Sequence, residues 1–217
     1  MGSTSADGVV IRDMKVEDYV EVKKLLLDSF YTAEPLSMCM QKTQQVGHSK
    51  RHDDLQIAMI EEGSCIVAVD EHNANCIVGI IMACNQGPSD DAENRERAKT
   101  AGPIFKFLTA IETEANIFER YKVSEAIYLH IVCVANNMRG KGLGTRLTSA
   151  LMKKAREKGL PLLVAECTSF YAARQMEAMG MECAYSLAYA DYKNEQGEVV
   201  FQPMQPHTHV NVMVKRL

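Results

Sequence analysis

Residues 134–147 read VANNMRGKGLGTRL, and they are the most informative segment of the chain. An apolar run ends within it, three alternate glycines follow, and a helical pattern then begins. A strand that enters a glycine turn before a helix aims free backbone N–H groups and the positive end of the helix dipole at one place. Glycines let phosphate oxygens approach the backbone, and Arg139 and Lys141 add positive charge. The stretch therefore predicts a phosphate or pyrophosphate site.

Two common phosphate-binding designs do not match this turn. A P-loop ends in Gly-Lys-Ser/Thr, and that triplet follows no predicted strand here. A dinucleotide turn reads Gly-x-Gly-x-x-Gly near the start of a βαβ unit, whereas Thr145 occupies the place of the third glycine, past the middle of the chain. The remaining hypothesis is the pyrophosphate of another cofactor.

The residues on both sides of the turn predict a strand, a helix and a second strand. AIYLHIVCV (126–134) is almost entirely apolar, as expected for a central strand covered on both faces. Leucines and alanines at helical spacing follow from Leu143 to Ala155, and PLLVAEC (161–167) reads as another buried strand.

The rest of the chain continues this alternation. Further strands are predicted at 9–14, 65–70, 76–84, 181–192 and 207–217, and further helices after Asp18, within 52–63, from Pro103 through Phe118, and at 169–180. We expect an α/β (α+β) fold in a single domain, 1–217, with a mixed, twisted central sheet of about seven strands flanked by helices. Residues 1–8 are expected to be a flexible N-terminus.

Two segments are predicted to lack regular structure. The first helix should break before Pro35, because the residue preceding a proline avoids helical angles, and a loop should follow with Glu34 near its bend. Residues 87–103 are charged, poor in apolar residues and bounded by Gly-Pro on both sides, which indicates a surface loop.

Composition argues against several classes of partner. The net charge is -4 and no basic block with interleaved aromatic residues occurs, so nucleic acid is not expected. No apolar run approaches the roughly 20 residues of a membrane helix, and the first residues do not resemble a signal peptide, so we expect a cytoplasmic protein without membrane contact. His207 and His209 have no acidic or thiol partner at ligand spacing, and no metal site is predicted.

The segment VCVANNMRGKGLG resembles the acetyl-CoA pyrophosphate motif of the GNAT acetyltransferase superfamily. In that motif a strand-ending valine is followed five residues later by Arg/Gln-x-x-Gly-x-Gly/Ala, a spacing that Val134, Arg139, Gly142 and Gly144 reproduce. The order of elements is also similar to that superfamily over almost the whole chain. The resemblance implies acetyl-CoA as co-substrate and a central strand that splays from its neighbour, so that Val132 and Val134 bond pantetheine through their main chains. The cofactor-binding residues that it implies are Val132, Cys133, Val134, Arg139, Gly140, Lys141, Gly142, Leu143, Gly144 and Thr145.

Further segments are similar to the insect arylalkylamine N-acetyltransferases, also called dopamine N-acetyltransferases. These segments are AEPL after the first helix, CTSFYAARQMEAMGM, and the terminal VNVMVKRL. The resemblance implies transfer of acetyl from acetyl-CoA to the primary amine of dopamine, serotonin, tyramine or octopamine. We expect a small-molecule arylalkylamine as partner and a monomer or weak dimer.

A protonated amine cannot attack a thioester, so a base must take its proton. The resemblance places this general base on Glu34, acting through a water, although a solvated glutamate at a helix end is the plain alternative. His130 is a second candidate, because LHIVCV also resembles the corresponding strand of the vertebrate arylalkylamine enzymes. A core histidine with a satisfied hydrogen bond is the alternative there.

The group that protonates the leaving thiolate is less well defined. Met176 aligns with the tyrosine that many GNAT enzymes use. Hydroxyls of the insect enzymes align with Thr168 and Ala172, of which only Thr168 keeps one. Ser169 lies next to it, so Thr168 and Ser169 are catalytic candidates whose alternative role is to cap the following helix.

Other functions stay open at this point. The chain could be a GNAT enzyme that acts on a polyamine, a protein lysine or N-terminus, or one that uses a long-chain acyl-CoA. It could also be a non-catalytic acyl-CoA-binding module, since the usual tyrosine is missing. A scaffold without a ligand is the hypothesis that the glycine turn supports least.

Overall fold

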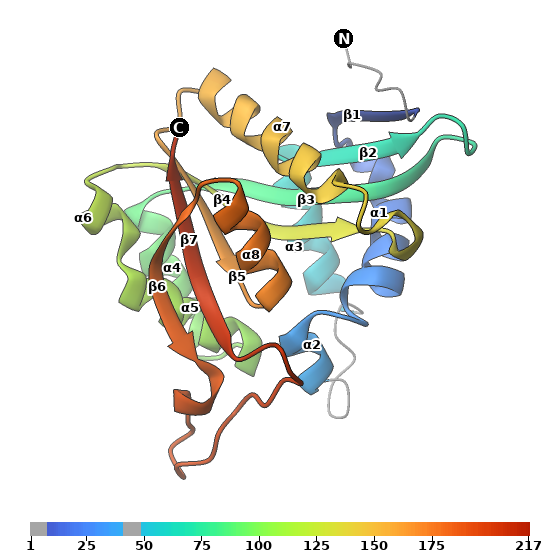
Figure 1. Ribbon diagram of the computed structural model, residues 1–217. Coiled ribbons are helices and arrows are strands. Elements are labelled where there is room, and N and C mark those ends of the chain that lie inside the picture. The colour runs from blue at the N-terminus through green and yellow to red at the C-terminus, as the bar shows by residue number, and fades with distance from the viewer. Residues whose placement is uncertain (1–7, 41–48) are drawn as a thin grey trace. The chain divides into compact units, whose positions relative to one another are not determined.

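The computed structural model describes residues 8–40 and 49–217, and its strands form one mixed sheet in the order β1-β2-β3-β4-β5-β7-β6 (Figure 1). The prediction of an α/β fold with seven strands and flanking helices is confirmed. The predicted flexible N-terminus, residues 1–8, lies outside the described residues except for Gly8. The strands are β1 (Val9–Asp13), β2 (Ile66–Asp70), β3 (Cys76–Gln86), β4 (Ala126–Val134), β5 (Leu162–Cys167), β6 (Glu182–Ala188) and β7 (His209–Arg216).

Eight α-helices occur in the described part of the chain. They are α1 (Tyr19–Leu25), α2 (Pro35–Met40), α3 (Lys50–Glu61), α4 (Pro88–Ala98), α5 (Pro103–Ala115), α6 (Ile117–Tyr121), α7 (Leu143–Glu157) and α8 (Phe170–Ala178). The described residues divide into two compact units. The first contains 8–33, 49–84 and 129–159, and the second contains 34–40, 85–128 and 160–217.

The first unit packs helices on both faces of β2 and β3. Figure 1 shows α7 on one side of these strands and α1 and α3 on the other. Gly79 permits the close approach of α7, because a Cβ at this position would lie 3.0 Å from Leu147 and 3.3 Å from Leu143. The opposite core is formed by Val22, Leu26, Ile60, Val67, Ile80 and Met82.

The second unit is built on β5, β6 and β7, which pair antiparallel in the order β5-β7-β6. Figure 1 shows α8 on one side of these strands and α4 and α5 on the other. The buried stripe of α5 packs against alternate residues of the strands, as its helical period predicts. This core includes Leu36, Phe107, Ile111, Phe118, Val164 and Val212.

Two predictions of irregular structure were wrong. Residues 88–98, expected to lie in a surface loop, form α4, and residues 35–40, expected in the loop after Glu34, form α2. Both helices begin with a proline, and a proline fits the first helical position because the N–H that it lacks has no partner there. In α4 the acidic residues of the first turn and the basic residues of the last turn also interact favourably with the helix dipole. The segment therefore forms a helix without an apolar stripe.

The helix predicted from Pro103 through Phe118 is divided in two. Asn116 ends α5 with φ 44°, a left-handed conformation that asparagine tolerates, and α6 begins at the next residue. Phe118 still packs in the same core, so its predicted burial is confirmed although it lies in a separate helix.

Candidate active site

The glycine turn connects β4 to α7 in the first unit and has the expected backbone geometry. Gly140 and Gly142 have φ 75° and 76°, in the left-handed region that favours glycine. Gly142 is the N-cap of α7, and the first backbone bond of the helix runs from the Arg146 N–H to the Gly142 carbonyl at 3.1 Å. The N–H groups of the residues before Arg146 therefore have no acceptor within the helix.

The turn suits an anion such as the pyrophosphate of acetyl-CoA. Gly140 and Gly142 are exposed, and no atom lies within 4 Å of the position of a Cβ on either. Exposed N–H donors at a helix N-terminus attract anions, and Lys141 adds an exposed ammonium group. Gly144 and Thr145 lie in the first turn of α7, whereas Leu143 is buried and packs inward.

Arg139 is held by two carbonyl groups of its own unit. Its Nη2 donates to the Ser29 carbonyl at 2.6 Å and its Nε to the Val134 carbonyl at 3.3 Å. Ser29 lies in a π-helical turn, Leu26–Phe30, in which the Tyr31 N–H donates to the carbonyl of Leu26 five residues earlier. Arg139 thus braces the turn against the end of the first helix, a role that the sequence did not predict.

The end of β4 presents alternate residues to opposite sides. Cys133 is buried in the core of the first unit, whereas Val132 and Val134 are half-buried. The Val134 carbonyl already accepts from Arg139, and the next N–H, of Ala135, donates to the Val78 carbonyl at 2.9 Å. Main-chain pairing of Val132 and Val134 with pantetheine stays a prediction.

Glu34 lies in the second unit, where its carboxylate caps the N-terminus of α2. One oxygen, Oε1, accepts from the Leu36 N–H at 3.0 Å, and the other, Oε2, accepts from the Ser37 N–H and the Ser37 hydroxyl, both at 2.6 Å. These donors hold the Glu34 carboxylate at the N-terminus of α2, where both of its oxygens accept hydrogen bonds.

Thr168 adds a fourth donor to this carboxylate. Its Oγ1 donates to Glu34 Oε1 at 2.7 Å, although 134 residues separate the two in the chain. The Tyr189 hydroxyl donates to the Thr168 carbonyl at 2.6 Å, which holds the connection between β5 and α8 in place. Two predicted catalytic residues, Glu34 and Thr168, are therefore in direct contact.

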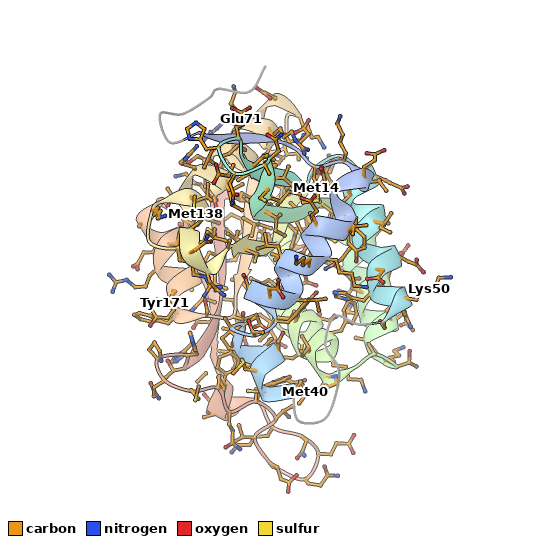
Figure 2. The ribbon with its side chains drawn as sticks, turned by 90° about the vertical axis from the view of Figure 1, so that its right-hand side faces the viewer. Met14, Met40, Lys50, Glu71, Met138 and Tyr171 are labelled. Atoms are coloured by element: carbon orange, nitrogen blue, oxygen red, sulfur yellow. The ribbon has the colours of Figure 1, made fainter. Side chains whose placement is uncertain are left out.

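Other residues at the start of α8 and along it cap the helix, pack in the core or point into solvent. Ser169 is the N-cap of α8, and its hydroxyl accepts from the Ala172 N–H at 3.0 Å. Met176 is buried and offers no proton. Tyr171 points into solvent from the exposed side of α8 (Figure 2), and its ring contacts His207 edge-on.

His130 lies on β4 in the first unit, with its Nε2 3.2 Å from the Cys84 thiol. Burial lowers the pKa of His130 from its ordinary value of 6.5 to about 4. The imidazole is therefore neutral at physiological pH and can accept a proton, but its low pKa makes it a weak base.

Ser37 and Tyr189 are the residues of this site that sequence reasoning missed. The indication for Ser37 was available: in Glu-Pro-Leu-Ser the proline can begin a helix, which makes Glu34 its cap and Ser37 the third helical residue. Tyr189 carried no local signal, since its role depends on how β6 and β5 come together.

A separate groove of about 580 Å³ runs along α8, β6 and β7 in the second unit. Its lining includes Phe170, Arg174, Glu177, Cys183, His209 and Asn211 and none of the predicted site residues. Across residues 8–40 and 49–217, no three His, Cys, Asp or Glu side chains are placed to hold a metal ion. Within the same ranges, no helix has the length and apolar character needed to cross a membrane.

A family model and several solved structures that are similar to this chain agree on one family of proteins. The model of the acetyltransferase (GNAT) family matches residues 21–181. An agmatine N-acetyltransferase structure is 28% identical, with a TM-score of 0.88 over 97% of this chain and 100% of that one. A mosquito arylalkylamine N-acetyltransferase-like 5b is 27% identical, with a TM-score of 0.85 over 96% and 100%. A Drosophila melanogaster polyamine N-acetyltransferase, which catalyses the formation of N-acetylagmatine, is 26% identical, with a TM-score of 0.86 over 96% and 100%.

Proposed function

Because this chain belongs to the GNAT acetyltransferase family, we propose that it transfers acetyl from acetyl-CoA to the primary amine of arylalkylamines such as dopamine, serotonin, tyramine and octopamine. The observation that carries the proposal is the contact between the Glu34 carboxylate and the Thr168 hydroxyl, at the start of α2 and just before α8. The glycine turn, with its exposed backbone donors, supports acetyl-CoA as the donor.

Glu34 is the general base in this proposal. Its four donors comprise two backbone N–H groups, which are fixed, and two hydroxyls, which can rotate. When the Thr168 or Ser37 hydroxyl turns away, a carboxylate lone pair becomes available to a water. That water takes the proton of the substrate ammonium and passes it to Glu34, which leaves a neutral amine.

Acetyl-CoA supplies the thioester carbonyl that the neutral amine attacks. The new bond joins the amine nitrogen to the acetyl carbon, and the bond from that carbon to sulfur breaks. The thiolate leaves with the electron pair and becomes the free thiol by taking the proton that Glu34 has accepted. The extra proton of the nitrogen then passes through the water to Glu34, which releases it to solvent. Thr168, which carries a hydroxyl beside Glu34, is our candidate for returning a proton to the sulfur.

The test is release of free thiol from acetyl-CoA with dopamine, tyramine, serotonin and a lysine peptide in parallel. We expect turnover with the aromatic amines, and a loss in kcat/KM of about 10²- to 10⁴-fold in Glu34→Gln, the range typical of a lost general base. Glutamine keeps an oxygen for the N-terminus of α2, so the helix should survive. Glu119→Gln, an exposed glutamate on α6, is the matched control.

A variant His130→Gln separates the two candidate bases. With Glu34 as the base it retains most of the activity, because a neutral imidazole is not required for proton removal. Loss of activity in His130→Gln with retention in Glu34→Gln contradicts the assignment. Binding of acetyl-CoA without thiol release for any amine contradicts the proposed reaction and favours an acyl-CoA-binding module.

Agmatine or a polyamine is a second candidate acceptor. Two of the structures similar to this chain, at 28% and 26% identity, are enzymes for agmatine or polyamines. Adding agmatine and spermidine to the same assay compares kcat/KM for these acceptors directly with kcat/KM for the arylalkylamines.

A further inference from the structure

A polar network inside the first unit joins α3 to α1 and to the turn that follows α1, and these two helices lie side by side (Figure 2). Gln56 is only 4% exposed, and its Nε2 donates to the Tyr31 hydroxyl at 3.3 Å. The Tyr19 hydroxyl lies 2.9 Å from Gln56 Oε1 and 2.7 Å from Asp53 Oδ1. Asp53 also pairs with Lys23 at 2.7 Å. Such a network fixes how the helices pack, because a buried polar group that loses its partner is costly.

Tyr31 lies at one end of this network and donates to His52. Because the Tyr31 hydroxyl accepts from Gln56, its own hydrogen is directed at His52 Nε2, 2.5 Å away. This direction requires that Nε2 carries no proton. Burial lowers the pKa of His52 from its ordinary value of 6.5, while Asp53 acts to raise it and Lys23 to lower it. The contact is therefore complete at neutral pH and is lost in acid.

The same tyrosine ends the π-helical turn that holds Arg139. The Tyr31 N–H closes this turn on the Leu26 carbonyl at 3.0 Å. Within the turn, the buried Ser29 offers its carbonyl to Arg139 Nη2 at 2.6 Å. Since α-helical bonding is far commoner, contacts outside the helix must favour the π-turn here. A continuous path of hydrogen bonds and backbone thus joins His52 to Arg139 within the first unit.

We propose that Tyr31 and His52 are positioning residues for acetyl-CoA, which hold the π-turn and, through Arg139, the conformation of the glycine turn. This inference rests on the proposed use of acetyl-CoA. When His52 Nε2 is protonated, the Tyr31 hydroxyl loses this acceptor, and the cost of the broken buried hydrogen bond favours relaxation of the π-turn. The Ser29 carbonyl then moves away from Arg139, and the glycine turn loses a support. Acetyl-CoA should therefore bind less tightly in mild acid, although neither positioning residue has to touch it.

The test is calorimetric binding of acetyl-CoA, without an amine, at about pH 7.5 and about pH 5, on either side of the ordinary histidine range. In His52→Gln an amide oxygen can take the place of Nε2 and does not titrate. We expect this variant to keep the wild-type Kd at the higher pH, and the Kd of the wild type to rise more than that of the variant at the lower pH. His52→Leu and Tyr31→Phe, which remove the acceptor and the donor, should raise the Kd at the higher pH by about 3- to 10-fold, as for one hydrogen bond. His72→Gln, an exposed histidine of the same unit, is the matched control and should behave as the wild type.

A double-mutant cycle shows whether the effect passes through Arg139. In an Arg139→Met background, His52→Leu should change the Kd by less than about twofold, because the contact through which it acts is already gone. Additive effects, or an unchanged Kd in both His52→Leu and Tyr31→Phe, overturn the inference.

If those two variants do not fold, the comparison of the wild type with His52→Gln decides, and an equal rise of the Kd in both at low pH overturns the inference. If acetyl-CoA binds with the expected pattern but no amine is acetylated, the inference stands and only the proposed reaction fails. Absence of acetyl-CoA binding to the wild type overturns both.

Discussion

At the scale of single residues, the Glu34 carboxylate serves two functions at once. It caps α2 through the Leu36 and Ser37 N–H groups and also faces the Thr168 hydroxyl. The fixed backbone donors hold the carboxylate in one orientation, so only a hydroxyl has to rotate when the amine arrives. Thr168 is in turn oriented by Tyr189, whose own hydroxyl is directed at the Thr168 carbonyl.

Removing the Thr168 hydroxyl tests this arrangement. Valine has nearly the same shape as threonine and no donor, whereas serine keeps the donor. We expect Thr168→Val to lower kcat/KM for the amine by about 10- to 100-fold, as for other hydrogen bonds to a charged group, and Thr168→Ser to stay near wild type. Steady-state kinetics with an aromatic amine measure the effect. Equal activity of the two variants contradicts a role for the hydroxyl.

Sequence reasoning identified Glu34 and Thr168 through family resemblance, and it identified neither their contact nor Ser37. A hydrogen bond between residues 134 positions apart depends on how α2 approaches the end of β5, which no local pattern encodes. The burial of Glu112 on α5 was missed for the same reason, since this residue looks solvated within its own segment.

At the scale of elements, the glycine turn is the part that sequence predicted best. The position of the turn between β4 and α7, the start of the helix at Leu143 and the left-handed glycines all follow from residue types with strong local preferences. By contrast, α4 was missed because it has no apolar stripe, and its proline, acidic first turn and basic last turn were the signals to use.

Substitution of Gly142 tests whether the turn requires a left-handed backbone conformation at this residue. Its φ is 76° and no atom lies within 4 Å of the point that a Cβ would occupy, so alanine is penalised by the backbone and not by a clash. We expect Gly142→Ala to destabilise the fold by about 1–2 kcal/mol and Gly142→Asn by less, since asparagine tolerates this conformation. Urea unfolding measures both.

The same two variants should raise the KM for acetyl-CoA in the same order, because the turn that they strain is the predicted pyrophosphate site. An asparagine variant that is less stable than the alanine variant contradicts the argument from φ.

At the scale of the whole molecule, two acids whose pKa values are raised, Glu112 on α5 and Asp91 on α4, make the stability depend on pH. The pKa of Glu112 is raised to about 7 and that of Asp91 to about 6. A carboxyl whose pKa is raised on folding binds more protons in the folded state, so its contribution is favourable at low pH and is lost as the pH rises through the folded pKa. We therefore expect the free energy of unfolding to decrease between about pH 5 and pH 8.

The low pKa of His130, about 4, acts in the opposite direction between about pH 4 and pH 6.5, because the unfolded chain then binds the extra proton. Glu112→Gln should flatten the decrease above pH 6 without altering the effect of His130. Urea titrations at pH 5, 6, 7 and 8 for wild type and Glu112→Gln measure this. A variant with the same pH dependence as wild type contradicts the assigned pKa of Glu112.

The two compact units are interleaved along the chain, and this affects how the protein can be made. The first unit takes its last segment from residues 129–159, and the second is completed only by residues 160–217. During synthesis on the ribosome, residues 8–33 and 49–84 cannot complete the first unit until β4 and α7 have emerged from the exit tunnel. Chains that terminate before Leu143 lack α7 and leave the apolar strands β2 and β3 without this cover, and exposed apolar surface of this kind is what chaperones bind.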